Sequence, residues 1–157
     1  MIFLSNSLKK LLAITIMCLS VFAGSTTALA LIYPKEIYDE IAYNYKEIGP
    51  ADPNYNCLAY ALGNTTSWIW PWSTDTATQS QVDNYLNLYG YSGNSFGYVY
   101  ATPGIISYGH GSDAINHFAR ATASYVAKSK WGQWELMETT WDPYKRSGYG
   151  PAQRYYK

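Results

Sequence analysis

Charged residues are scarce in this chain, and neither sign of charge predominates. Of its 157 residues only 14% are charged, with 11 basic and 11 acidic side chains and a formal net charge of zero. Proteins that bind nucleic acid or an anionic membrane surface usually carry a clear excess of positive charge. We therefore expect neither nucleic acid nor a membrane surface as a partner.

Long apolar runs are also absent, apart from one at the N-terminus. Lys9 and Lys10 precede an apolar stretch over 11–24, and the segment that ends at Ala30 has the Ala-x-Ala pattern of a signal-peptidase site. The stretch is shorter than the roughly 20 residues that span a bilayer, so we expect no stable membrane insertion. The predicted organisation is a signal peptide over 1–30 and one secreted domain over 31–157.

Cysteine is scarce as well. The chain has two, Cys18 and Cys57, and removal of the signal would take Cys18 away. Met17 disfavours a lipoprotein site at Cys18, because a small residue is expected there. A lone cysteine in a secreted chain is either reactive or buried and inert. One cysteine and two histidines, His110 and His117, make a poor ligand set, so we predict no metal site and no cofactor.

The remaining pattern reads as helices first and strands later, which predicts an α+β domain. Apolar residues at helical spacing predict helices over 34–48, from 57 to 62 and over 79–89. Asn54 or Asn56 can cap the second helix, and Gly63 can end it. Segments rich in β-branched and aromatic residues predict antiparallel strands near 98–101, 104–108, 117–122, 125–130, 134–139 and 152–156. The alanine-rich segment 113–128 can also be read as a helix.

Cys57 lies in the first turn of a predicted helix, where the helix dipole favours a thiolate. His117 opens a predicted strand on which His117, Ala119 and Ala121 share one face. Small side chains on that face would let the cysteine helix approach, so sulfur and imidazole could meet as nucleophile and general base. His110 lies in a glycine-flanked loop. The alternative is that Cys57 and His117 are ordinary core residues.

The order of several motifs resembles the papain-like NlpC-type cell-wall peptidases and amidases, and more closely a group of secreted Gram-positive proteins. The motifs are YNCLAYA at 55–61, PGIISYG at 103–109, HFA at 117–119, SKWGQ at 129–133, PY at 143–144 and YY at 155–156. The resemblance implies a papain-like fold, in which N-terminal helices that include the cysteine helix pack on a C-terminal antiparallel sheet. The sequence departs from the NlpC pattern at Ile105, where an aspartate usually stands.

The resemblance also implies roles for further residues. Glu138 would orient His117 as the third catalytic group in place of a histidine of the relatives, with Thr139 or Glu135 as alternatives. The oxyanion donors would be the Cys57 backbone N–H and a side chain upstream of it, from Asn54, Tyr55 or Asn56. Trp131 of the SKWGQ motif is a candidate substrate-binding residue, although packing near the sheet is its alternative role.

The predicted function is a secreted cysteine hydrolase, extracellular or associated with the cell wall, that cleaves an amide bond in a peptidoglycan stem peptide or another peptide. The acyl group of the thioester intermediate could also pass to an amine. The alternative is a papain-like binding module with a buried, inert Cys57. The 17 tyrosines and 6 tryptophans fit a wall that meets sugars or peptides, and equally a core built with tyrosine. The WIWPW segment at 68–72 could line a groove or cover the core.

Overall fold

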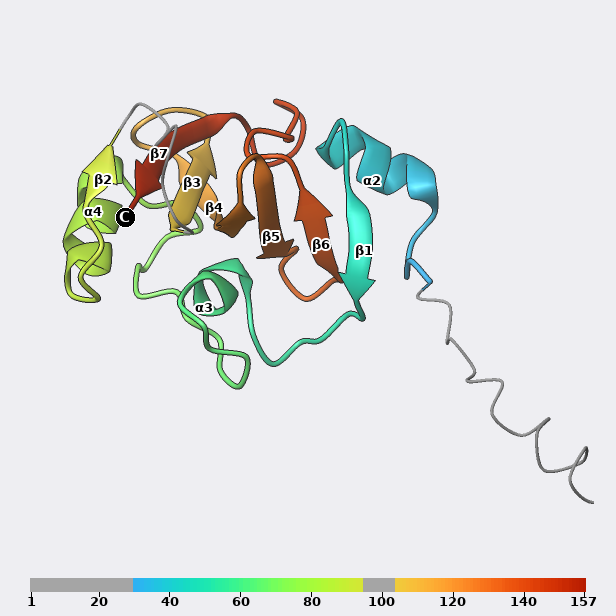
Figure 1. The fold of residues 1–157 in the computed structure, drawn as a ribbon, viewed down its shortest axis with the longest axis horizontal. Coiled ribbons are helices and arrows are strands. Elements are labelled where there is room, and N and C mark those ends of the chain that lie inside the picture. The colour runs from blue at the N-terminus through green and yellow to red at the C-terminus, as the bar shows by residue number, and fades with distance from the viewer. Residues whose placement is uncertain (1–29, 95–103) are drawn as a thin grey trace, which may run out of the picture.

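The structure, a computed structural model, describes residues 30–94 and 104–157 (Figure 1). Its described part is an α+β fold built on one seven-stranded antiparallel sheet, which confirms the predicted class. The strand order is β1-β6-β5-β4-β3-β7-β2. The helices are α2 (Lys35–Ile41), α3 (Cys57–Ala61) and α4 (Gln79–Asn87); the strands are β1 (Lys46–Gly49), β2 (Gly93–Asn94), β3 (Ile105–Gly109), β4 (Ile115–Ala123), β5 (Val126–Lys130), β6 (Leu136–Thr139) and β7 (Ala152–Tyr156).

Apolar clusters cover both faces of the sheet, because successive residues of a strand point to opposite sides. One cluster joins α2 to the sheet and contains Tyr38, Ala42, Ile106, Tyr108, Ala119, Ala121, Ala127, Trp131, Met137 and Tyr144. The other joins α3 and α4 to the sheet and contains Cys57, Leu58, Ala61, Ala77, Val82, Leu86, Ile105, Ile115, Phe118 and Tyr156. We call them the tyrosine cluster and the helix cluster. Buried tyrosine side chains therefore form a large part of the core.

The prediction of a helix over 34–48 is wrong for its second half. Helix α2 ends at Ile41, and Ala42 is extended, with φ −142° and ψ 153°. Ala42 forms an antiparallel bridge with Tyr144, and the chain then enters β1, which pairs with β6. Sheet pairing at long range thus overrides the helical spacing of the apolar residues in this segment.

The ends of the other two helices follow the predicted signals. The Asn56 side chain accepts a hydrogen bond from the Ala59 N–H at 3.0 Å, as a helix N-cap does. Gly63 lies just beyond α3 with φ 83°, a conformation that glycine adopts without steric cost. Helix α4 begins with a capping box between Thr78 and Gln81, and it ends two residues before the predicted boundary.

Strands β3 to β7 match the predicted segments, and β7 has the predicted bounds. Strands β4 and β5 form a hairpin, so the helical reading of 113–128 is wrong. The chain turns there at Tyr125, which has φ 57°. The predicted strand near 98–101 lies outside the described residues, and β1 and β2 were not expected. Within residues 30–94 and 104–157, no helix is long and apolar enough to cross a membrane.

Candidate functional site

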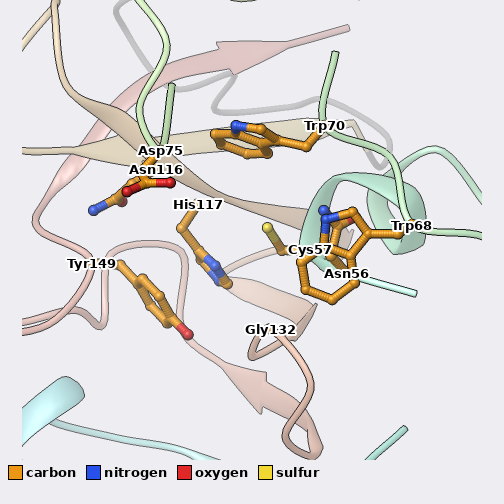
Figure 2. Close-up of a pocket in the computed structure, with 9 residues that line it drawn as sticks. All are labelled: Asn56, Cys57, Trp68, Trp70, Asp75, Asn116, His117, Gly132 and Tyr149. Atoms are coloured by element: carbon orange, nitrogen blue, oxygen red, sulfur yellow. The ribbon is translucent and has the colours of Figure 1, made fainter. Parts of the chain in front are cut away.

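A pocket of about 250 Å³ brings together the cysteine and the histidine that the sequence singled out (Figure 2). Cys57 comes from the start of α3 and His117 from β4. The pocket is lined by Asn56, Cys57, Trp68, Trp70, Asp75, Asn116, His117, Gly132 and Tyr149. Figure 2 shows the Cys57 sulfur pointing into the pocket on the side of the His117 ring. His110 lies in a different hollow, beside Arg146.

The cysteine helix reaches the histidine by a route that the sequence did not predict. Ala119 and Ala121 point into the tyrosine cluster, away from α3, whereas α3 packs in the helix cluster with Phe118. The pairing of β3 with β4 shifts register between Tyr108 and Gly109, which leaves an extra residue in β4 at Asn116. Such a bulge re-aims side chains. It explains how the consecutive residues Asn116 and His117 both line the pocket.

Cys57 is nearly enclosed, with 5% of its surface exposed. Burial raises the pKa of its thiol to about 11, and the backbone N–H groups of Phe118 and Leu58 offset only part of that rise. The expected lowering of the thiol pKa is therefore not seen. Helix α3 has only five residues, so its dipole does not outweigh the loss of hydration.

His117 is held by two tyrosines and is 1% exposed. Its Nε2 lies 3.1 Å from the Tyr144 hydroxyl, and its ring stacks on Tyr149 with centroids 3.8 Å apart. Burial lowers the pKa of His117 to about 3, so the ring is neutral at pH 7. Its Nδ1 is buried and has no hydrogen-bond partner among the described residues. No hydrogen bond therefore joins that nitrogen to the Cys57 sulfur within the described residues.

The expected contact between Glu138 and His117 is absent from the described structure. Glu138 pairs instead with Lys128 of β5 at 3.6 Å, and about a third of each side chain is exposed. Strand alternation explains the difference: Met137 and Thr139 face the buried side of β6, whereas Glu138 lies between them and faces away. The place beside Nε2 is taken by Tyr144.

Neither alternative to Glu138 forms a hydrogen bond with His117 among the described residues, although Thr139 lies beside the Tyr144 hydroxyl. The Thr139 hydroxyl donates to the Thr140 carbonyl at 3.0 Å. Glu135 is fully buried, and its carboxylate accepts hydrogen bonds from the Tyr38 hydroxyl at 2.7 Å and the Ile32 N–H at 2.6 Å. Glu135 therefore fastens α2 and the segment before it to the sheet.

Sequence reasoning missed Tyr144 and Tyr149, which surround the histidine. Tyr144 lies in the PY motif, but no periodicity in that loop indicated that its hydroxyl would turn inward. The Tyr144 hydroxyl also lies 2.8 Å from Ser129 Oγ and accepts a hydrogen bond from Trp131 Nε1 at 3.2 Å. The SKWGQ and PY motifs thus meet at the histidine.

The four candidate binding residues have different surroundings. Asn56 lines the pocket; its Oδ1 caps α3 and its Nδ2 donates to the Ile69 carbonyl at 2.8 Å. Asn54 is exposed in a turn, and Tyr55 is buried with Lys130 Nζ 5.2 Å from its ring centroid. Trp131 is 1% exposed and belongs to the tyrosine cluster. Of the four, Asn56 is the one that lines the pocket.

Lys130 lies beneath the turn that carries Gly132, a role that the sequence did not indicate. It is fully buried, and its Nζ donates to the carbonyls of Gly132, at 3.1 Å, and Trp134. These bonds hold the turn that places Gly132 at the pocket. Burial lowers the pKa of Lys130 to about 8. When protonated, the ammonium favours a thiolate on Cys57 by charge attraction.

The WIWPW segment serves both of its expected roles. Trp68 and Trp70 line the pocket, and 49% of Trp68 is exposed. Trp72 stacks on Phe118 of the helix cluster, with ring centroids 6.1 Å apart. Asp75 and Asn116 add polar groups to the same cavity. The pocket thus has an aromatic wall with hydrogen-bonding groups beside it.

The chain belongs to the family described as "Domain of unknown function (DUF7689)", whose model matches residues 46–157. The matched region contains every residue that lines the pocket and every strand of the sheet. No curated protein and no solved structure matched the chain.

Proposed function

We propose that this member of the DUF7689 family is a papain-like cysteine hydrolase that cleaves an amide bond. Cys57 is the nucleophile and His117 the general base. The observation that carries the proposal is that both side chains line one pocket, and that His117 Nδ1 is buried without a hydrogen-bond partner among the described residues. An unsatisfied buried polar atom costs about 1–3 kcal/mol, a cost that proteins tolerate most readily where the group has a chemical task.

The two groups start the reaction uncharged, because burial raises the thiol pKa and lowers the imidazole pKa. As the sulfur attacks the amide carbon, His117 Nδ1 accepts the thiol proton. The imidazolium then donates that proton to the leaving nitrogen, the C–N bond breaks, and the acyl group stays on Cys57 as a thioester. A water molecule, deprotonated by Nδ1, attacks the thioester, releases the acid and restores the thiol.

The negative oxygen that forms during attack requires hydrogen-bond donors. The first N–H groups of a helix have no intrahelical acceptor, and Cys57 is the first residue of α3. Its backbone N–H is therefore the main-chain donor of choice. The Asn56 side chain carries two amide hydrogens, of which one bonds Ile69. The other can supply a second donor from the pocket wall.

The substrate class remains the peptide or peptidoglycan stem peptide that the motif order suggests. Flat aromatic walls from Trp68 and Trp70 suit an extended peptide, and Asp75 and Asn116 suit its polar groups. Secretion, to the extracellular space or the cell wall of a Gram-positive organism, belongs to the same proposal. It is supported by the signal-like N-terminus.

A second candidate function is a binding module of the same fold. The observation that favours it is the enclosure of Cys57, which is 5% exposed and whose thiol has a raised pKa. In that case the pocket would hold a peptide without cutting it. Cys57 would then be a small core residue.

Digestion of stem peptides and muropeptides, followed by mass spectrometry, separates the two candidates. The hydrolase account predicts fragments that have gained one water, and it predicts their loss in both Cys57→Ala and His117→Ala. His110→Ala is the matched control, because His110 lies outside the pocket and its loss should leave the fragments unchanged. Binding of the peptides by wild type without any cleavage would favour the binding module.

A further inference from the structure

Three hydrogen bonds meet on one oxygen, the Tyr144 hydroxyl. Trp131 Nε1 lies 3.2 Å from it, Ser129 Oγ 2.8 Å and His117 Nε2 3.1 Å. All four residues of this network are buried. A phenol offers one proton and two lone pairs, so three bonds use its capacity completely. Thr139 also lies beside this hydroxyl, but its own proton goes to the Thr140 carbonyl. The directions of the three bonds are therefore linked.

Trp131 fixes the first direction. An indole N–H can only donate, so Trp131 occupies one lone pair of the Tyr144 oxygen. One proton and one lone pair remain for Ser129 and His117. Either Tyr144 donates to Ser129 and accepts from His117, or Ser129 donates to Tyr144 and Tyr144 donates to His117. Burial keeps the pKa of Tyr144 far above its usual value, so the phenol retains its proton in both arrangements.

The two arrangements give opposite tautomers of a neutral histidine. If Tyr144 accepts from His117, the ring proton is on Nε2 and Nδ1 has a free lone pair. If Tyr144 donates to His117, the proton is on Nδ1 and the ring cannot take a proton from the thiol at that atom. The 3.1 Å separation of Nε2 and the hydroxyl fits an N–H donor, whose usual distance is about 2.9–3.0 Å, better than an O–H donor at about 2.7–2.8 Å.

We propose that Ser129, Trp131 and Tyr144 are positioning residues that hold His117 as its Nε2–H tautomer and so leave Nδ1 free to act as a base. This inference rests on the proposed function and names the groups that support its base. Tyr144 accepts from Trp131 and His117 and donates to Ser129. Two motifs that are separate in the sequence, SKWGQ and PY, thus act together to orient His117.

The tautomer can be measured directly, without a substrate. In protein labelled with ¹⁵N-histidine, long-range ¹H–¹⁵N spectra distinguish the two tautomers, and His110→Ala assigns the two ring systems. We expect His117 in the Nε2–H form at pH 7. Removing the acceptor in Ser129→Ala frees the Tyr144 proton for Nε2, so we expect the Nδ1–H form to become populated. Ser129→Thr keeps a hydroxyl and should restore the Nε2–H form.

Kinetics supply a second readout where a substrate is in hand. A histidine held wholly in the wrong tautomer lowers the kcat of a hydrolytic triad by about 10⁴-fold. Because kcat scales with the fraction of the competent tautomer, a fall of the Nε2–H form to about 10–1% in Ser129→Ala should lower kcat by about 10- to 100-fold with little change in KM, and Ser129→Thr should recover most of it.

An Nδ1–H form in the wild type would overturn the inference, and so would spectra of Ser129→Ala and Tyr144→Phe that keep the wild-type tautomer. The wild-type spectrum decides even if a variant fails to fold. Failure of the proposed function would give a different result. His117 would be in the Nε2–H form, as the network predicts, but the protein would cleave none of the peptides.

Discussion

The Tyr149 ring lies flat against the His117 imidazole, with centroids 3.8 Å apart and an interplanar angle of 6°. The stack covers one face of the histidine while Tyr144 meets Nε2 at the ring edge, with its own ring almost perpendicular to the imidazole. Two tyrosines thus limit both the tilt and the rotation of the ring. The remaining nitrogen, Nδ1, is buried without a partner among the described residues, and His117 lines the same pocket as Cys57.

Removing the stack should therefore hydrate the histidine. In Tyr149→Ala we expect the pKa of His117 to rise from about 3 toward its ordinary value near 6.5, because burial is the cause of its depression. The lost aromatic contact should also lower the free energy of unfolding by about 0.5–1.5 kcal/mol beyond the loss of buried area. Histidine ¹H NMR titration and urea unfolding measure the two effects. Tyr149→Phe keeps the stack, and a raised His117 pKa in that variant would contradict the explanation.

Acid should destabilise the fold through His117. The folded-state pKa is depressed to about 3, so the neutral ring contributes stability that is fully present above the unfolded value of about 6.5. That contribution is lost as the pH falls from about 6.5 to about 3, and at 1.36 kcal/mol per pKa unit it amounts to at most about 5 kcal/mol. The measurement is urea unfolding of wild type and His117→Asn at several pH values. The stability difference should shrink toward acid, and a constant difference would show that the pKa of the buried ring is not depressed.

Alkylation of Cys57 should be slow at neutral pH. Its thiol has a pKa raised to about 11, so almost none of it is thiolate at pH 7, and the rate should climb steeply only above pH 9. His117→Ala should change this profile little, because the neutral histidine supplies no positive charge. The check is the pH dependence of the iodoacetamide rate, followed by intact mass. A plateau below pH 8 that vanishes in His117→Ala would instead reveal a thiolate–imidazolium pair.

Glu138→Gln should leave turnover unchanged. Its carboxylate pairs with Lys128, about a third of each side chain is exposed, and surface ion pairs contribute about 0–1 kcal/mol. Tyr144→Phe is the informative comparison, because it removes the hydroxyl beside His117 Nε2. We expect kcat to fall in Tyr144→Phe alone. A fall in Glu138→Gln of similar size would return the third catalytic role to the carboxylate.

Asn56→Ala should lower the free energy of unfolding by destabilising α3, the helix that carries Cys57. It removes the N-cap of α3 and the bond to Ile69, and the loss of a cap costs about 0.5–2 kcal/mol. Asn56→Asp keeps the acceptor that caps the helix but lacks the amide donor. Urea unfolding should therefore show Asn56→Asp between wild type and Asn56→Ala, and turnover should fall in both variants if the amide also serves the oxyanion. Equal stability of Asn56→Ala and wild type would contradict the capping role.

The sequence was most informative where local chemistry decides the structure. Asn56 and Gly63 bound α3 because capping and positive φ are properties of single residues and their neighbours. The bounds of β7 and the pairing of Cys57 with His117 in one pocket also followed from short patterns. Each of these signals extends over only a few residues around the feature it describes.

The features that the sequence did not predict correctly depend on contacts with residues far along the chain. Ala42 leaves the helix to pair with Tyr144, although the apolar spacing through 48 is helical. Glu138 could not be excluded as the histidine's partner until the face of β6 was known. Tyr144 reaches His117 from a loop with no periodicity of its own, so only the folded chain reveals the contact.

The most direct test of the central claim is the intact mass of the protein during turnover of a slowly hydrolysed acyl substrate, such as an activated ester of a stem peptide. The account predicts a covalent acyl adduct on Cys57 that decays by hydrolysis in the wild type. It predicts no adduct in Cys57→Ala and a slowly formed one in His117→Ala. Cleavage that persists in Cys57→Ala, or an adduct confined to another residue, would contradict the account.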